Sequence, residues 1–283
     1  MMKILNFSII LSLITSYPSH SHDGSLAINE INYKVDKFGR ILSSEGRKAM
    51  PCPNQTPDTA VFLITGQSNA ANYGETLFKT SYPAKVLNFF QGKCFSAASP
   101  LIGADGKAGE SWTILADKLI ETGKFDQVIL LSSGIGATAI ERWQQGGDLN
   151  LMLLKAVKSA QRKYRITHVL WHQGEADLVR KTSTEAYVTR FESFARSLRK
   201  VNVRAPIYVS ITSKCIHPEG WKSDDAVTIA QRQLVNPSEG IFAGPNTNDL
   251  VLPGDRYDKC HFANSGQLKF ADEWLRILND DRR

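Results

Sequence analysis

The chain has 283 residues, of which 42% are hydrophobic and 22% are charged. This composition is sufficient for one large hydrophobic core, and it excludes a disordered or collagen-like chain. The formal net charge is +6, but the lysine and arginine residues are scattered and form no basic run. We therefore expect no nucleic-acid partner.

The first 22 residues have the organisation of a secretory signal peptide. A lysine, Lys3, precedes an apolar segment of about a dozen residues, and a polar stretch rich in small residues follows it. The apolar segment is too short to span a bilayer comfortably, and no later segment is apolar enough to do so. We expect residues 1–22 to be removed, leaving a secreted or periplasmic protein without stable membrane insertion. An uncleaved anchor or a buried helix is the alternative.

Apolar strand-like runs alternate with longer amphipathic segments along the rest of the chain. Nearly continuous apolar runs are typical of strands that are buried on both faces, so the alternation predicts an α/β fold with a mostly parallel sheet between helices. The expected strands are residues 60–65, 127–133, 167–172 and 206–212. The expected helices are residues 111–123, 149–164, 185–200, 226–235 and 265–278. Residues 23–58 lack this pattern and are interpreted as an N-terminal extension of a single domain, residues 59–283.

Polar and small residues follow the predicted strands, at the edge where open parallel sheets form their sites. The first strand leads into "GQSN", the second into "SGIGAT" and the third into "WHQGEAD", and "DKCH" precedes the last helix. These blocks contain the parts of an ester hydrolase. His261 would take the proton of Ser68 as a general base, and Asp258 would hold the imidazole in the required tautomer.

Two alternatives remain open for these residues. Ser68 or Asn69 would serve equally well as the cap of a helix that follows the first strand. Glu175 is the alternative to Asp258 as the partner of His261, although the Asp-x-x-His spacing, which places acid and imidazole on one short turn, favours Asp258.

The four blocks together resemble the SGNH hydrolase superfamily, and "GQSN", "WHQGEAD" and "DKCH" look like its sialate O-acetylesterase and family 6 carbohydrate esterase branch. The resemblance covers roughly residues 60–278. It implies a three-layer α/β/α sandwich with a five-stranded, mostly parallel, flavodoxin-like sheet. It also implies a Ser-His-Asp triad that uses no metal or other cofactor. The implied substrate is an acetylated carbohydrate, either sialic acid or an acetylated polysaccharide, which loses its O-acetyl groups through an acyl-enzyme.

The resemblance also suggests which groups hold the oxyanion: the N–H groups of Ser68 and Gly136 and the side-chain amide of Gln173. The superfamily usually has asparagine where this branch has glutamine, but both provide an NH₂ donor. Relatives commonly read Gly-Gly-Thr where this chain reads Gly136-Ala137-Thr138, so the Ala137 N–H is the second choice. The substitution should matter little unless that residue requires a positive φ. The alternative for Gln173 is a bracing role between loops.

Other polar residues near the blocks are candidates for substrate binding. These are Gln67, Asn69, Arg142 and Glu175. Arg142 and its neighbour Trp143 would line a sugar site, or would simply pack. Strand alternation points His172 away from the site, so we expect it to be a hydrogen-bonded structural residue.

The four cysteines are Cys52, Cys94, Cys215 and Cys260, an even set without C-x-x-C spacing. In an exported protein this set favours two disulfides, and three pairings are possible. We expect Cys215 to pair with Cys260 and Cys52 with Cys94. Cys260 lies between Asp258 and His261, so this bridge would tether that loop to the end of the fourth strand.

Three functions are compatible with these patterns. The presence of serine, histidine and aspartate together favours a secreted carbohydrate O-acetylesterase, because a binding module has no need of all three. The alternatives are a catalytically inactive relative that binds glycans, and a GDSL-type lipase or thioesterase that acts on longer acyl chains.

Overall fold

The structure is a computed structural model that describes residues 32–215 and 224–280. The expected signal peptide, residues 1–22, and the first part of the N-terminal extension lie outside the described residues. Within the described ranges, no helix combines the length and the apolar character needed to cross a membrane.

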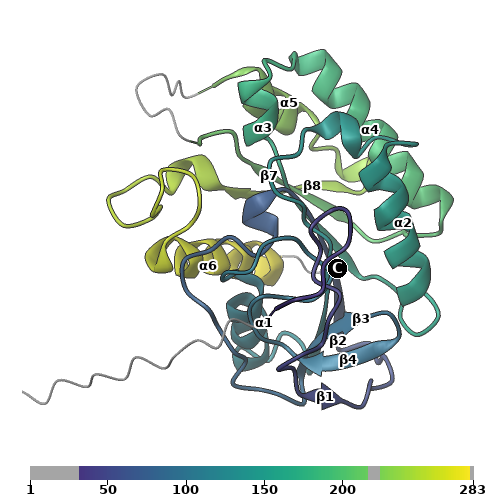
Figure 1. The fold of residues 1–283 in the computed structure, drawn as a ribbon. Coiled ribbons are helices and arrows are strands. Elements are labelled where there is room, and N and C mark those ends of the chain that lie inside the picture. The colour runs from purple at the N-terminus through teal and green to yellow at the C-terminus, as the bar shows by residue number, and fades with distance from the viewer. Residues whose placement is uncertain (1–31, 216–223, 281–283) are drawn as a thin grey trace, which may run out of the picture. The chain divides into compact units, whose positions relative to one another are not determined.

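One sheet organises the described residues. Its strands lie in the order β1-β4-β3-β5-β2-β6-β7-β8 (Figure 1). Every neighbouring pair from β3 to β8 in this order is parallel, whereas β4 runs antiparallel to β1 and β3. The strands are β1 (Ala49–Met50), β2 (Thr59–Gly66), β3 (Val86–Phe90), β4 (Lys93–Ser96), β5 (Gln127–Ser132), β6 (His168–His172), β7 (Ile207–Ile211) and β8 (Ile241–Asn246).

The sheet is larger than the five strands implied by the resemblance. The strands β5, β2, β6, β7 and β8 do follow the order 2-1-3-4-5 that defines a flavodoxin-like sheet. The difference lies at the other edge, where β3 pairs with β5 and continues into β4 through a tight turn. Gln91 and Gly92 both have positive φ there, as a two-residue hairpin turn of the primed type requires. Gln-Gly is a weak signal for such a turn, so the sequence did not predict this hairpin.

Helices cover both faces of the sheet, as predicted. Figure 1 shows α1 and α6 on one face and α2, α4 and α5 on the other. The five expected helices are confirmed, and α3 is a short helix that the sequence did not predict. The helices are α1 (Trp112–Glu121), α2 (Asp148–Ala160), α3 (Glu175–Val179), α4 (Thr184–Lys200), α5 (Ala226–Gln233) and α6 (Asn264–Asp280).

The alternation of β2 divides the hydrophobic core into two layers. Val61 and Leu63 belong to the cluster that packs under α2, α4 and α5. Phe62 and Ile64 point the other way, into the cluster formed with α1 and α6. Successive side chains of a strand face opposite sides, so the continuous apolar run of β2, residues 60–64, is stable only between two layers of helices.

Part of the expected N-terminal extension is attached to the sheet. The short strand β1 pairs with β4, and Cys52 in the same segment forms a disulfide with Cys94 of β4. This is the expected pairing, and it fixes the extension at the edge that the β3-β4 hairpin adds.

Gly66 ends β2 in a conformation that only glycine adopts easily. Its φ is +132°, and a Cβ there would lie 2.0 Å from the carbonyl oxygen of His172 on β6. We expect Gly66→Ala to lower the free energy of unfolding by about 3 kcal/mol or more, because it adds both strain and a clash with backbone. Urea denaturation measures this loss.

Gly123→Ala is the matched control. Gly123 also has a positive φ, +69°, but no atom lies within 4 Å of the added Cβ. It should cost only about 1 kcal/mol, from strain alone. Equal losses in the two variants would contradict the close approach of β2 and β6.

Candidate active site

A pocket of about 460 Å³ opens where the parallel strands end. Every one of the four sequence blocks contributes to its lining, because each block directly follows a strand of the same edge or precedes α6. From these blocks the pocket is lined by Gln67, Ser68, Gly136, Ala137, Glu175, Ala176, Asp258, Cys260 and His261.

Asp258 and His261 form the expected Asp-x-x-His turn. The Oδ2 atom of Asp258 lies 2.6 Å from His261 Nδ1, and its Oδ1 accepts the backbone N–H groups of Cys260 and His261 at 3.0 and 2.7 Å. Burial raises the pKa of Asp258, but these N–H donors outweigh it and lower the pKa below its usual value. Asp258 therefore stays a carboxylate at neutral pH. It, and not Glu175, is the partner of the imidazole.

Ser68 occupies the first position of a one-turn 3₁₀ helix, η1 (Ser68–Ala70), directly after β2. The N-cap of this helix is therefore Gln67 and neither Ser68 nor Asn69. Ser68 is only 4% exposed. Ser68 and His261 line the same pocket, but no hydrogen bond joins their side chains in the described part of the chain. Such contacts are often long in unliganded hydrolases and tighten when substrate binds.

The structure does not leave the Gln173 amide free to hold an oxyanion. Its Nε2 lies 2.5 Å from Asp177 Oδ2 and 2.9 Å from the Thr138 carbonyl oxygen, which uses both amide hydrogens. Gln173 is fully buried and does not belong to the pocket lining. These contacts favour the alternative, a bracing role.

Gly136 is also already bonded. Its N–H donates to Asp105 Oδ2 at 3.2 Å, so a carboxylate occupies the place expected for the oxyanion. The N–H of Ala137 donates no hydrogen bond to any of the described residues. Ala137 has a φ of +55°. Alanine is strained in this conformation and glycine is not, so having alanine where relatives commonly have glycine costs stability.

Two of the four residues expected to bind substrate line the pocket. Gln67 does so, although its Oε1 accepts the N–H groups of Gly174 and Ala176 at the start of α3. Glu175 lines the pocket and is 1% exposed. Its Oε1 accepts a hydrogen bond from Asn69 Nδ2, which also bonds the Cys260 carbonyl oxygen. Asn69 thus connects three blocks and is not part of the lining.

Arg142 and Trp143 do not line the pocket, contrary to the sugar-site interpretation. Arg142 forms a two-pronged ion pair with Asp148, with nitrogen-oxygen distances of 3.1 and 2.7 Å. Trp143 is completely buried in the hydrophobic core. Because both side chains are used within the protein, the packing alternative is correct.

His172 is a buried structural residue, as predicted. It is completely buried, and its Nε2 lies 3.0 Å from Thr247 Oγ1. Burial lowers the pKa of His172 to about 4, Glu175 raises it and Arg256 lowers it further. The imidazole is therefore neutral at neutral pH.

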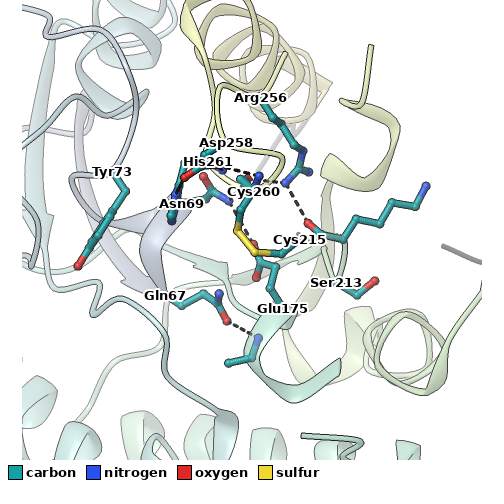
Figure 2. The surroundings of a disulfide bond; sticks show 12 residues. Gln67, Asn69, Tyr73, Glu175, Ser213, Cys215, Arg256, Asp258, Cys260 and His261 are labelled. Carbon is teal, nitrogen blue, oxygen red and sulfur yellow. Dashed lines mark hydrogen bonds and ion pairs between the residues drawn. A yellow bond between two sulfur atoms is a disulfide. The ribbon is translucent and has the colours of Figure 1, made fainter. Parts of the chain in front are cut away.

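The loop that carries Asp258 and His261, residues 256–261, is called here the Asp-His loop. Cys260 forms the expected disulfide with Cys215, which follows β7 (Figure 2). Arg256 links the same two segments, because its guanidinium donates to the carbonyl oxygens of Lys214 and Cys260 at 3.0 and 2.6 Å. The loop is therefore attached twice to the end of the sheet.

Three functional candidates were not found from the sequence. They are Tyr73, which stacks on His261, Asp105, which accepts the Gly136 N–H, and Arg256. Asp105 lies in the glycine-rich segment "IGADGKAG", which was the only available signal. Tyr73 and Arg256 have no spacing that distinguishes them from other aromatic or basic residues.

Residues 58–277 match the model of a family described as carbohydrate esterase, sialic acid-specific acetylesterase. This match spans more than half of the 283 residues. The chain belongs to this family. As a carbohydrate esterase it is a carboxylic ester hydrolase, and the resemblance drawn from the sequence blocks is confirmed.

Curated relatives of this carbohydrate esterase include a probable carbohydrate esterase of Arabidopsis thaliana. It is 25% identical over 186 residues, which are 57% of this chain and 70% of the relative. A peroxisomal butyrate–CoA ligase of the same plant is 31% identical over 96 residues. That stretch is 33% of this chain and 16% of the ligase, which is too little to carry the ligase's activity across.

Solved structures share the fold of this carbohydrate esterase. The crystal structure of the Arabidopsis protein has a TM-score of 0.61 at 19% identity and covers 80% of this chain and 99% of its own. A carbohydrate acetylesterase from Xanthomonas citri has a TM-score of 0.51 at 15% identity, and the match covers 79% of this chain and 57% of the acetylesterase. A putative GDSL-like lipase from Parabacteroides merdae has a TM-score of 0.51 at 13% identity, and the match covers 81% of this chain and 100% of the lipase chain.

The bonds of Gln173 predict that its loss damages the fold more than the reaction. Gln173→Ala removes two donors from buried acceptors, so we expect the free energy of unfolding to fall by about 2–4 kcal/mol. We expect kcat to fall less than about tenfold, because removing an oxyanion donor costs 10²-fold or more. Thermal unfolding and steady-state kinetics measure the two effects.

Gln231→Ala is the control, because Gln231 is equally buried and braces the Thr212 backbone through both ends of its amide. The two variants should lose similar stability and similar kcat. A kcat loss confined to Gln173→Ala, above about 10²-fold, would restore Gln173 to the oxyanion site.

The buried His172 predicts a loss of stability in acid. Its pKa is about 4 in the folded chain against 6.5 as a reference, so the unfolded chain binds more protons between these values. Stability therefore falls as the pH drops from 6.5 towards 4. His172→Gln cannot bind the proton and should reduce this slope by up to about 1.4 kcal/mol per pH unit. Urea denaturation at several pH values tests this, and an unchanged slope would contradict it.

Proposed function

We propose that this carbohydrate esterase is an exported serine esterase that removes O-acetyl groups from carbohydrates. One observation carries the proposal: Ser68 and an imidazole held by a carboxylate line the same pocket. The Nδ1 atom of His261 faces Asp258, so its Nε2 is the atom that remains for the Ser68 proton.

The first half of the proposed reaction forms an acetyl-enzyme. Ser68 Oγ attacks the acetyl carbonyl carbon while His261 Nε2 takes the hydroxyl proton. Asp258 stabilises the imidazolium through the Nδ1–H bond. When the tetrahedral intermediate collapses, the same proton passes to the leaving sugar oxygen. The products are an acetyl ester on Ser68 and a free sugar hydroxyl.

The second half returns the enzyme to its resting state. A water molecule gives a proton to His261 and attacks the acetyl-Ser68 carbonyl, and the collapse of this intermediate releases acetate and reprotonates Ser68. The N–H groups of Ser68 and Ala137 would hold the oxyanion in both halves. Ala137 replaces Gly136 in this role because the Gly136 N–H is bonded to Asp105.

Gln67 and Glu175 remain the proposed substrate contacts, since both line the pocket. Export is supported by the two disulfides, which persist in oxidising compartments outside the cytosol. In this proposal residues 1–22 are a signal peptide, residues 23–58 an extension and residues 59–283 the esterase domain, and the protein is secreted or periplasmic.

The test is acetate release from a panel of acetylated carbohydrates that includes O-acetylated sialic acid, acetylated xylan and acetylated peptidoglycan fragments. We expect release from at least one of them, and Ser68→Ala should reduce it at least about 10³-fold because no other nucleophile lies in the position of Ser68. Ser159→Ala on α2 is the control and should leave release unchanged.

Other outcomes would contradict the proposal. Equal rates for the wild type and Ser68→Ala, together with glycan binding, would indicate a catalytically inactive binding relative. A p-nitrophenyl ester series in which rates rise from acetyl to longer chains would indicate a GDSL-type lipase or thioesterase instead.

A further inference from the structure

The ring of Tyr73 lies against the proposed base. The centroids of the Tyr73 and His261 rings are 5.2 Å apart, and their planes are inclined by 22°, which is a stacked arrangement. Tyr73 and His261 lie near one another in Figure 2. The Tyr257 ring also stacks on the imidazole, at 6.0 Å and 29°. Asp258 contacts one edge of the imidazole, so these rings restrict the remaining freedom of His261 to tilt.

The hydroxyl of Tyr73 is bonded to a carboxylate that also reaches the second sequence block. Tyr73 Oη donates to Asp105 Oδ2 at 2.7 Å, and the Gly136 N–H donates to the same oxygen at 3.2 Å. The backbone of Asp105 bridges the same two segments, because its carbonyl oxygen accepts the Asn72 N–H and its N–H donates to the Gly134 carbonyl oxygen. Burial and the neighbouring Asp105 raise the pKa of Tyr73, which keeps its hydroxyl a donor.

Tyr73 is also closely packed. A Cβ on Gly136 would lie 2.7 Å from its Oη, and a Cβ on Gly106 would lie 2.8 Å from its Cε2. The two glycines therefore allow the ring to sit directly on backbone. A ring packed in this way has little room to move, so it also limits the movement of the His261 ring that stacks on it.

We propose that Tyr73 and Asp105 are positioning residues that hold the base His261 and the loop of Gly136 and Ala137 in one fixed relation. This inference rests on the proposed function. Ser68 attack requires the proton acceptor and the oxyanion donors to be in place together, and small displacements of either are costly. The face of a tyrosine ring also favours the imidazolium that forms during attack.

The test compares Tyr73→Phe, Tyr73→Leu and Asp105→Asn in the full chain, using a substrate that the wild type deacetylates. Tyr73→Phe keeps the ring but loses the Asp105 bond, and we expect kcat to fall about tenfold with KM changed less than about twofold. Tyr73→Leu also loses the stack and should lower kcat about 10²-fold. The double variant Tyr73→Phe/Asp105→Asn should be no worse than the poorer single variant, because both changes break one connection.

Tyr164→Phe is the matched control. It removes the bond from the Tyr164 hydroxyl to the Pro53 carbonyl oxygen, outside the pocket lining, and should leave kcat and KM unchanged. Wild-type kcat in the Tyr73 variants would overturn the proposal. A rise in KM with kcat intact would also overturn it, since Tyr73 would then bind substrate. Losses of kcat that disappear when each variant is assayed well below its melting temperature would also overturn it, since unfolding alone would then explain them.

A measurement without turnover separates this proposal from the proposed function. The His261 ring protons lie in the ring current of Tyr73, so their NMR resonances should move and broaden in Tyr73→Leu but stay nearly unchanged in Tyr164→Phe. Unchanged His261 resonances in Tyr73→Leu would overturn the positioning role even if the protein hydrolysed no ester. Failure of the proposed function shows instead as equal rates for the wild type and Ser68→Ala.

Discussion

The Asp-His loop belongs to no strand, and the site depends on how Arg256 holds it. The half-buried guanidinium donates to four carbonyl oxygens, those of Lys214, Thr247, Leu250 and Cys260. Three of these bonds join the loop to segments that follow β7 or β8. The fourth, to Cys260, closes the loop on itself. Because the donor is charged, such bonds are stronger than those between neutral groups. The Arg256 guanidinium also lies over the Phe262 ring, 5.2 Å from its centroid. The Cys215–Cys260 disulfide then adds a covalent link at the same place.

Two donors at or beneath the pocket, the Gln173 amide and the Gly136 N–H, are already bonded to carboxylates of the protein. Asp177 is completely buried, and its carboxylate accepts hydrogen bonds from Gln173, Thr182 and the Ile140 N–H. A buried carboxylate without hydrogen-bond donors would destabilise the fold, so the Gln173 amide is needed as a donor to Asp177. The same reasoning applies to Gly136, whose N–H satisfies Asp105. The backbone N–H of Ala137, which has no acceptor among the described residues, is therefore a better oxyanion donor than either group.

Local patterns were sufficient for most of the fold and for part of the site. The apolar runs at 60–65, 127–133, 167–172 and 206–212 are strands because a sheet covered on both faces needs continuous apolar residues. The Asp-x-x-His turn was also predictable, since its acid and imidazole are three residues apart and meet through local geometry. The disulfide between Cys215 and Cys260 followed from the same local placement at strand and loop ends. The β3-β4 hairpin was not predicted, because a Gln-Gly turn carries little signal, and the strand β8 was not predicted either.

The remaining features depend on contacts between residues far apart in the chain. Gln173 braces the loops through Asp177, four residues later in the chain, and through the carbonyl oxygen of Thr138, 35 residues earlier, which reaches it only in the folded chain. The contact of Tyr73 with His261 joins residues from opposite ends of the domain. The sequence thus carries the elements, the ester-hydrolase chemistry and the local acid-base pair, because propensity, periodicity and short spacing encode them. The assignment of each donor to its acceptor belongs to the tertiary structure, because burial makes every polar group compete for the partners that packing brings within reach.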